Sequence, residues 1–182
     1  EPCPVDLAAK WKTLIYMRSS EQEFWDGYEN QLITVFDDFS QKADTSANPN
    51  LELFEIIRSS NCFPYPLHMA SLDQKASTQF MSKVIIVSSN QERPETASLN
   101  YPDALYRRFN VCVRVKRRQV EGGFEPNAYF FERYNMLTGE SEGQISYKEL
   151  VRACVESYHG GKNFVSSVED YIASILTVPD PA

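Results

Sequence analysis

The sequence predicts an α/β fold in which helices flank a largely parallel β-sheet. Two stretches, residues 32–40 and 83–90, each consist of an apolar run followed by polar side chains. Between them, residues 51–59 carry apolar side chains at helical spacing, so the chain alternates strand, helix and strand. This order is typical of a βαβ unit. We expect the strand at 32–36 to be the central one and to be buried on both faces.

The composition limits the classes of protein to which the chain can belong. Its 182 residues suit one ordinary domain, or one domain with a small appendage. Hydrophobic residues make up 42%, and no apolar run approaches the roughly 20 residues of a membrane-spanning helix. The net charge of -7 argues against a protein coated in nucleic acid but leaves room for a local basic patch. The four cysteines include no CxxC pair, which favours reduced thiols over a disulfide framework.

The rest of the first half is predicted from its turn residues and apolar spacing. We expect the end of a helix at 5–11, a short strand at 14–17 and a loop at 21–28. The aromatic rings of that loop are expected to pack on the core. After the helix at 51–59, prolines at alternate positions force extended backbone, and residues 69–80 are expected to project as a hairpin or loop.

A concentration of positive charge marks the middle of the chain. Residues 103–109 predict a short helix with two arginines, and residues 111–116 predict a strand with one basic face, followed by another strand at 129–136. The sequence leaves open whether this charge forms a solvated face or contacts phosphates. The basic residues concerned are Arg107, Arg108, Arg114, Lys116, Arg117 and Arg118.

The last third is predicted to contain two helices. A capping box of the form S-x-x-E begins at Ser146 and opens a helix, which the glycine pair at 160–161 is expected to end. A second box at Ser166 is expected to open another helix. We therefore divide the chain into a core at 1–118 and a small α+β extension with two helices at 119–182.

The paired acids Asp37 and Asp38 are the first candidate site. They follow the central strand directly, and the carboxyl edge of a parallel sheet is where open α/β folds hold their ligands. Two neighbouring carboxylates repel each other unless a cation offsets their charge, and Mg²⁺ prefers such oxygen ligands. The alternative is structural, because Asp38 or Ser40 is also suited to cap the next helix.

Four stretches taken together resemble a known family. They are EFWDGY at 23–28, ITVFDDFSQ at 33–41, FPYPLHMASLDQKASTQFMSKVIIVSSN at 63–90 and ALYRRF at 104–109. In this order and spacing they resemble the helicase-like ATPases of picornaviruses and of dicistrovirus-like and iflavirus-like arthropod viruses, within helicase superfamily 3. DDFSQ is similar to the Walker B motif, MASLDQK to the B-prime motif, VIIVSSN to motif C and YRRF to the arginine finger of that family.

The resemblance implies a P-loop NTPase core of the AAA+-like kind that hydrolyses ATP with Mg²⁺. Asp37 would be the principal acid of the Mg²⁺ water shell, and Asp38 would activate or position water. Asn90 would act as a sensor near the γ-phosphate. Arg107 and Arg108 would be the finger pair that acts on the nucleotide of the neighbouring subunit, and the sequence does not rank them.

The resemblance also implies partners. Lys75 is the candidate for contacting single-stranded RNA in a central channel, although a solvated loop lysine is an equally open interpretation. Relatives form homo-oligomers, with a hexamer expected here, and act with other viral replication proteins. They associate with membranes through a segment outside this chain. The expected location is therefore the host-cell cytoplasm, at membrane-associated replication complexes.

One family motif is missing, because the 182 residues contain no GxxxxGK[ST] phosphate loop. In relatives this loop precedes the helix expected at 5–11, so we interpret the chain as a fragment of a viral polyprotein. The parent would hydrolyse nucleoside triphosphate and act on viral RNA, while the fragment alone would be inactive. One alternative is a non-catalytic module for oligomerisation and RNA binding. Another is a metal-dependent phosphohydrolase with Asp37 as its nucleophile.

Overall fold

The computed structural model describes residues 10–19, 21–71, 77–118 and 128–176. The helix expected at 5–11 lies outside them. The chain divides into two compact units, Glu1–Phe109 and Asn110–Ala182. This division comes earlier than the border at 118 drawn from the sequence, because the basic strand before that border pairs with a strand of the second unit.

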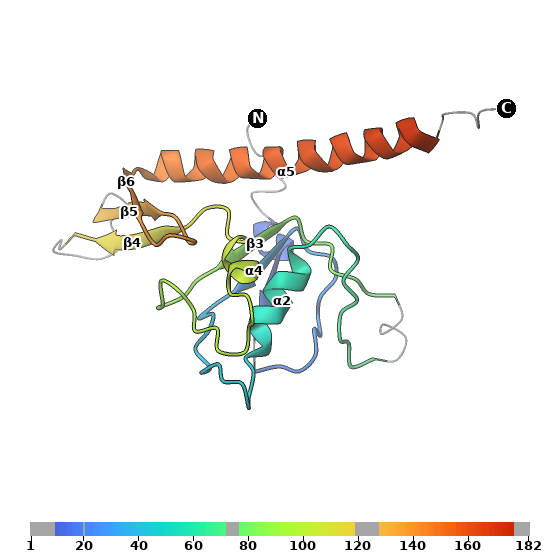
Figure 1. The fold of residues 1–182 in the computed structure, drawn as a ribbon, viewed down its shortest axis with the longest axis horizontal. Coiled ribbons are helices and arrows are strands. Elements are labelled where there is room, and N and C mark those ends of the chain that lie inside the picture. Colours follow the sequence, from blue (N-terminus) through green and yellow to red (C-terminus); the bar gives the residue numbers. More distant parts are fainter. Residues whose placement is uncertain (1–9, 20, 72–76, 119–127, 177–182) are drawn as a thin grey trace. The chain divides into compact units, whose positions relative to one another are not determined.

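The first unit is built on a parallel three-stranded sheet with the order β1-β2-β3. Figure 1 labels strand β3 and the helices α2 and α4 of this unit. The α/β class, the central position of the strand after residue 32 and the helix that follows it are therefore confirmed. The elements are the 3₁₀ helix η1 (Trp11–Leu14), β1 (Ile15–Arg18), β2 (Ile33–Phe36), α2 (Leu51–Ser59), β3 (Val84–Val87) and α4 (Asp103–Tyr106).

Strand β2 is fully buried on one face only. Thr34 and Phe36 are buried, whereas Ile33 and Val35 are half-buried. The prediction of burial on both faces is therefore wrong for the described residues. The reason lies in the neighbouring strands, because the register partners of Val35 are Met17 and Ile86, which are both about half exposed.

Two rings of the aromatic loop at 21–28, Trp25 and Tyr28, pack in the core, as predicted. Trp25 is 1% exposed, and its indole ring lies 5.7 Å from the Tyr16 ring and 6.1 Å from the Phe36 ring, measured between centroids. Tyr28 is also buried, and its hydroxyl accepts hydrogen bonds from the backbone N–H groups of Met81 (2.7 Å) and Ser82 (2.9 Å). The rings thus fix an irregular segment to the sheet because they supply large apolar area and a polar group that is satisfied.

A buried ion pair joins β1 to α2. The Arg18 guanidinium donates to both carboxylate oxygens of Glu55, at 3.0 Å and 2.7 Å, and lies 4.7 Å from the centre of the Trp25 ring. Further hydrogen bonds from Arg18 reach the backbone carbonyls of Ser19 and Phe24. A buried charge with this many partners holds the first strand against the helix in one geometry.

The second unit consists of an antiparallel sheet, β4-β5-β6, followed by helix α5 (Tyr147–Leu176). Its strands are β4 (Val113–Arg117), β5 (Tyr129–Tyr134) and β6 (Ser141–Ile145), of which β6 was not predicted. No helix among the described residues is long and apolar enough to cross a membrane.

Helix α5 corrects the prediction of two C-terminal helices. The capping box is present as predicted, since Ser146 Oγ accepts from the Glu149 N–H at 3.3 Å and Glu149 Oε2 accepts from the Ser146 N–H at 2.7 Å. The helix then continues without a break through Gly160 and Gly161 and past Ser166. A glycine ends a helix by adopting the left-handed conformation, and neither glycine has a positive φ.

Candidate functional site

The carboxyl ends of β2 and β3 meet at one edge of the parallel sheet. Phe36, the last residue of β2, is buried, and the next two residues, Asp37 and Asp38, are exposed. Phe36 pairs with Val87, the last residue of β3, so the polar residues that follow each strand emerge side by side. This is the position that the sequence predicted for the candidate site.

Hydrogen bonds connect the two acids to the residues after β3. The Ser88 hydroxyl donates a short hydrogen bond to Asp37 Oδ1, and the Asp38 N–H donates to Ser88 Oγ at 3.2 Å. Asn90 Nδ2 donates to Asp38 Oδ1 at 3.4 Å. The structure therefore brings Asp37, Asp38 and Asn90 together. Ser88 is the residue that the sequence analysis missed, although its place directly after an apolar strand was a usable signal.

The turn after β2 holds Asp38 and Ser40 in an unusual backbone conformation. Asp38 and Ser40 have φ values of 51° and 65°, in the left-handed region that non-glycine residues rarely adopt. Phe39 between them is buried, its N–H donates to the Ser88 carbonyl at 2.8 Å, and its carbonyl accepts from Ser89 Oγ at 2.8 Å. Burying the Phe39 ring offsets the cost of the turn and keeps both carboxylates at the surface.

A network of buried polar groups is hydrogen-bonded to this turn at Ser40. The Ser40 N–H donates to Glu52 Oε2 at 3.0 Å, and Glu52 is only 4% exposed. Asn50 caps α2 through the Glu52 N–H and donates its own N–H to Asp44 Oδ1 at 2.8 Å. The second Asp44 oxygen accepts from the Ser98 N–H at 2.7 Å. The loop after β3 is thereby tied to the start of α2.

The carboxylate of Asp44 is the anchor of this network. Burial raises its pKa, but the hydrogen bonds from the N–H groups of Asn50 and Ser98 outweigh burial, so the pKa lies below its ordinary value. The charged form therefore persists well below neutral pH. No pattern in residues 41–50 of the sequence indicates that Asp44 is buried.

The two arginines after α4 differ in their surroundings. Arg107 is exposed, whereas Arg108 is half-buried and its Nε has no hydrogen-bond acceptor among the described residues. No hydrogen bond or ion pair within the described part of the chain joins either arginine to Asp37, Asp38 or Asn90. Their action on a neighbouring subunit therefore stays a prediction, and exposure favours Arg107 for it.

Lys75 lies outside the described residues, but the chain on either side of it is paired. Pro66 and Gln79 form an antiparallel bridge, and the Leu67 N–H donates to the Thr78 carbonyl at 3.0 Å. This pairing fits the hairpin alternative of the prediction for residues 69–80. The contact of Lys75 with RNA stays a prediction.

The chemistry of the sheet edge suits a hard cation held through water. Asp37 and Asp38 present carboxylate oxygens to solvent, and such oxygens are the ligands that Mg²⁺ prefers. Within the described residues no group of three or more His, Cys, Asp and Glu side chains is placed to hold a metal ion. The acids are thus suited to contact an ion that also has water and phosphate ligands.

Comparison with known proteins adds a family and a set of relatives. Residues 5–91 match the protein family described as RNA helicase. The chain is 50% identical over 114 residues to the replicase polyprotein of Acute bee paralysis virus (strain Rothamsted), and 38% identical over 128 residues to that of Cricket paralysis virus. It is 27% identical over 162 residues to the genome polyprotein of Human hepatitis A virus genotype IIA (isolate CF-53).

The coverage of these matches is unequal. They extend over 63%, 70% and 89% of this chain, in the same order, but over only 6%, 7% and 6% of the viral polyproteins. The chain therefore spans a small part of the length of the curated relatives it matches.

Proposed function

Because the chain belongs, over residues 5–91, to the RNA helicase family found in viral replicase polyproteins, we propose that its parent protein is an ATP-hydrolysing motor. This motor hydrolyses nucleoside triphosphate at the edge of a P-loop NTPase sheet and acts on single-stranded viral RNA during genome replication. One observation carries the proposal. Asp37, Asp38 and Asn90 converge at the ends of two adjacent parallel strands, where α/β folds bind nucleotides.

The proposed site uses Mg²⁺ and ATP. Asp37 and Asp38 would hold the ion through its water shell, and the bound ion would neutralise charge on the β- and γ-phosphates. The hydrogen bond from Ser88 fixes the carboxylate of Asp37 toward β3. That orientation leaves the other Asp37 oxygen to face the water shell.

In the proposed site, Asp38 and Asn90 would lie next to the attacking water. Asp38 would accept a hydrogen bond from the attacking water and orient it, as the water-positioning residue of an NTPase does. The Asn90 amide donates to Asp38. In this proposal the same side chain would also sense the γ-phosphate. The left-handed turn at Asp38 limits the directions in which this carboxylate can point.

The remaining roles require more than one chain. We propose a ring, with six subunits expected, in which Arg107 reaches the nucleotide of the neighbour and offsets transition-state charge. The ring would work at membrane-associated replication complexes in the host-cell cytoplasm, together with other viral replication proteins. Because the 182 residues contain no GxxxxGK[ST] sequence, the chain alone is expected to bind the triphosphate poorly and not to hydrolyse it.

The test is hydrolysis by a longer viral protein that contains this chain and its upstream residues. Asp38→Asn is expected to lower kcat by about 100-fold or more, since the amide is a poor acceptor for the proton of the attacking water. Glu23→Gln is the control, because Glu23 is an exposed acid in the aromatic loop rather than at the sheet edge. Turnover by Asp38→Asn close to that of the control would defeat the proposal and leave a non-catalytic module as the better interpretation.

A mixing experiment tests the role of Arg107. Arg107→Ala and Asp38→Asn subunits are each expected to be inactive alone. When mixed, the intact acid of one variant meets the intact arginine of the other at some interfaces, so part of the turnover returns. Mixtures that stay as inactive as the separate variants would remove Arg107 from the shared site.

A further inference from the structure

A cleft at one end of the antiparallel sheet lies entirely within the second unit. Its volume is about 340 Å³, at the lower end of the range for pockets that bind small molecules or single residues. It is formed where β4 ends, β5 begins and β6 passes into α5. The side chains that matter for the inference are Arg118, Tyr129, Phe130, Gln144 and Tyr147.

Three aromatic residues line this cleft, and the side chain of one of them is largely exposed. Tyr147, the first residue of α5, is 68% exposed. Its ring lies 6.2 Å from that of Phe131, so it is held at the foot of the helix by one neighbour. Tyr129 and Phe130 are half-exposed. Exposed rings that share a cleft offer flat apolar surfaces for stacking, which scattered surface aromatics do not.

One charged residue, Arg118, lines the cleft, and the neighbouring basic residues of β4 are already paired. On β4, Arg114 and Lys116 are paired with Glu132, at 3.2 Å and 2.5 Å. Hydrogen bonds from Lys116 and Ser141 and the charges of the two basic residues lower the pKa of Glu132, so this carboxylate stays ionised and neutralises them in part.

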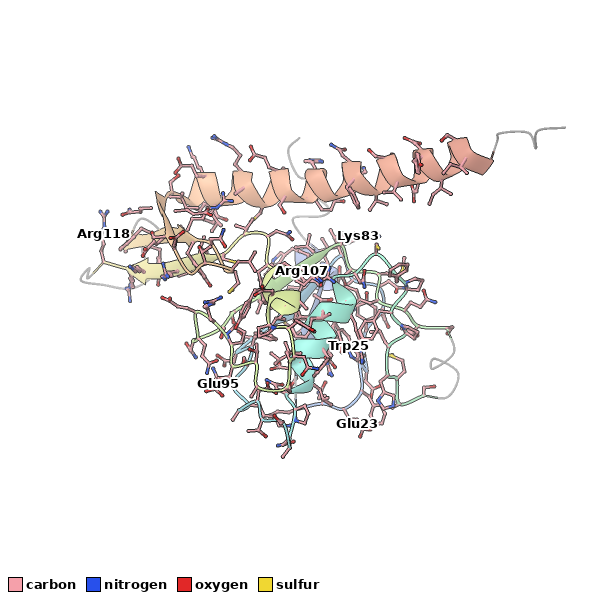
Figure 2. The ribbon with its side chains drawn as sticks, in the orientation of Figure 1. Glu23, Trp25, Lys83, Glu95, Arg107 and Arg118 are labelled. Carbon is pink, nitrogen blue, oxygen red and sulfur yellow. The ribbon has the colours of Figure 1, made fainter. Side chains whose placement is uncertain are left out.

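Arg118 is the basic residue that belongs to the cleft itself. It extends from the end of β4, where its label stands in Figure 2, and its guanidinium lies 5.6 Å from the centre of the Phe130 ring. It has no ion-pair partner among the described residues. A guanidinium held over a ring, without a carboxylate, keeps its charge available for an anionic ligand.

We propose that this cleft binds one nucleotide of single-stranded RNA, with its base stacked on Tyr147 and its phosphate next to Arg118. Gln144 lines the same cleft and offers an amide to the edge of the base. The ligand is a single strand because stacking on protein rings requires a base that is not already paired. The inference rests on the proposed action on RNA and places a contact far in sequence from Lys75.

Rings and charge together favour RNA over an acidic protein partner. An acidic peptide would be bound through charge and would not use the exposed ring of Tyr147 for stacking. A nucleotide uses both features, because base stacking on aromatic side chains and phosphate contacts with arginine are the two usual components of single-strand binding.

The test measures binding of the 182-residue chain to a fluorescein-labelled oligouridylate by fluorescence anisotropy, without nucleotide. Tyr147→Ala is expected to weaken binding about 5- to 10-fold. Tyr147→Phe keeps the ring and is expected to bind as tightly as the unsubstituted chain. The matched control is Tyr171→Ala, because Tyr171 lies on the same helix and is equally exposed, at 67%. Equal affinities of the two alanine variants would overturn the inference.

The contribution of charge is measured by salt dependence. Arg118→Gln is expected to reduce the slope of log K against log salt by about 0.7, the value for one phosphate contact with a single strand. Arg152→Gln, an exposed arginine on α5, is expected to leave the slope unchanged. Competition by inorganic polyphosphate as effective as that by unlabelled oligouridylate would show binding by charge alone and would overturn the stacking contact.

This experiment is independent of catalysis. Because the binding experiment contains no ATP, loss of hydrolysis in Asp38→Asn does not affect its result. Absence of the stacking contact would likewise not contradict the proposed ATPase. Duplex RNA is the last arm, and it is expected to bind more weakly than the single strand. Duplex binding of equal strength would contradict recognition of an unpaired base.

Discussion

The two sheets of this chain differ in how far apart in the sequence their partners lie. In the parallel sheet, the hydrogen bond between Ser88 and Asp37 joins residues 51 positions apart. The strands that they follow, β2 and β3, pair directly, and the chain between these strands contains helix α2. In the antiparallel sheet, β5 and β6 are joined by a short turn, and the capping box of α5 spans three positions. The candidate catalytic site therefore depends on tertiary structure, whereas the proposed RNA cleft rests mainly on local structure.

The same two regions differ in burial. In the parallel sheet, the Phe36 ring of β2 packs against Trp25 and Phe39, and all three side chains are 1% exposed or less. Helix α5 leaves most of its apolar side chains in solvent, among them Phe164 at 68% and Ile172 at 50%. Substitutions in the first region should therefore disturb a packed core, while substitutions in the second should act on one helix. Each prediction below tests whether this contrast holds.

The largest expected effect is that of Trp25→Ala. The indole is buried among the rings of Tyr16, Tyr28 and Phe36, so its removal leaves a cavity and costs about 3–5 kcal/mol of unfolding free energy. Hydrogen exchange followed by mass spectrometry should show lost protection in β1, β2 and β3. Because β4, β5 and β6 belong to the other compact unit, their protection should stay unchanged.

A tryptophan of the same unit supplies the control. Trp11 is 54% exposed, so Trp11→Ala is expected to change the unfolding free energy by less than about 0.5 kcal/mol. Equal losses for the two variants would mean that the aromatic loop is not the centre of the core. A loss of protection in both sheets after Trp25→Ala would instead show that the units unfold together.

A smaller effect, which depends on pH, is expected for Asp44→Asn. The carboxylate accepts the N–H groups of Asn50 and Ser98, and hydrogen bonds to a charged acceptor contribute about 2 kcal/mol. Because the folded pKa of Asp44 is lowered, its contribution is complete above the unfolded value of about 3.9 and is lost as pH falls through the folded pKa.

Urea unfolding at several pH values checks this prediction. The unsubstituted chain should be more stable than Asp44→Asn by a constant amount from pH 7 down to about pH 4. The difference in unfolding free energy should narrow at lower pH. A difference that instead grew on acidification would mean that the neutral acid is the form bound in the folded protein. That result would also remove the support that this network gives to the turn at Ser40.

The sequence was sufficient to place Asp37, Asp38 and Asn90 because parallel strands bring their carboxyl ends to one edge. It was not sufficient for Ser88 or for the network of Asp44 and Glu52, because those contacts depend on where two loops return to the sheet. Composition alone does not predict these contacts, since a polar side chain in a loop can form its hydrogen bonds with water instead. The arginines after α4 show the same limit, because their partner would belong to another chain.

The antiparallel region shows a different limit. Glycine at 160–161 predicted the end of a helix, and a glycine pair has two outcomes, a left-handed end or a continued helix at a cost of about 1 kcal/mol each. The sequence does not decide between them. In the structure neither glycine has a positive φ, and helix α5 continues to Leu176.

The smallest expected effect tests this continuous helix directly. An added Cβ at Gly160 or Gly161 meets no atom within 4 Å, so Gly160→Ala and Gly161→Ala should each increase helix stability by about 0.5–1 kcal/mol. Circular dichroism on heating should show greater helicity at every temperature below the midpoint. The control is Gly139→Ala, because Gly139 has φ 76° in the turn before β6 and a side chain there is strained. If the chain instead broke at the glycine pair, one of the two alanines would occupy a left-handed position and would lower helicity, as two separate helices require.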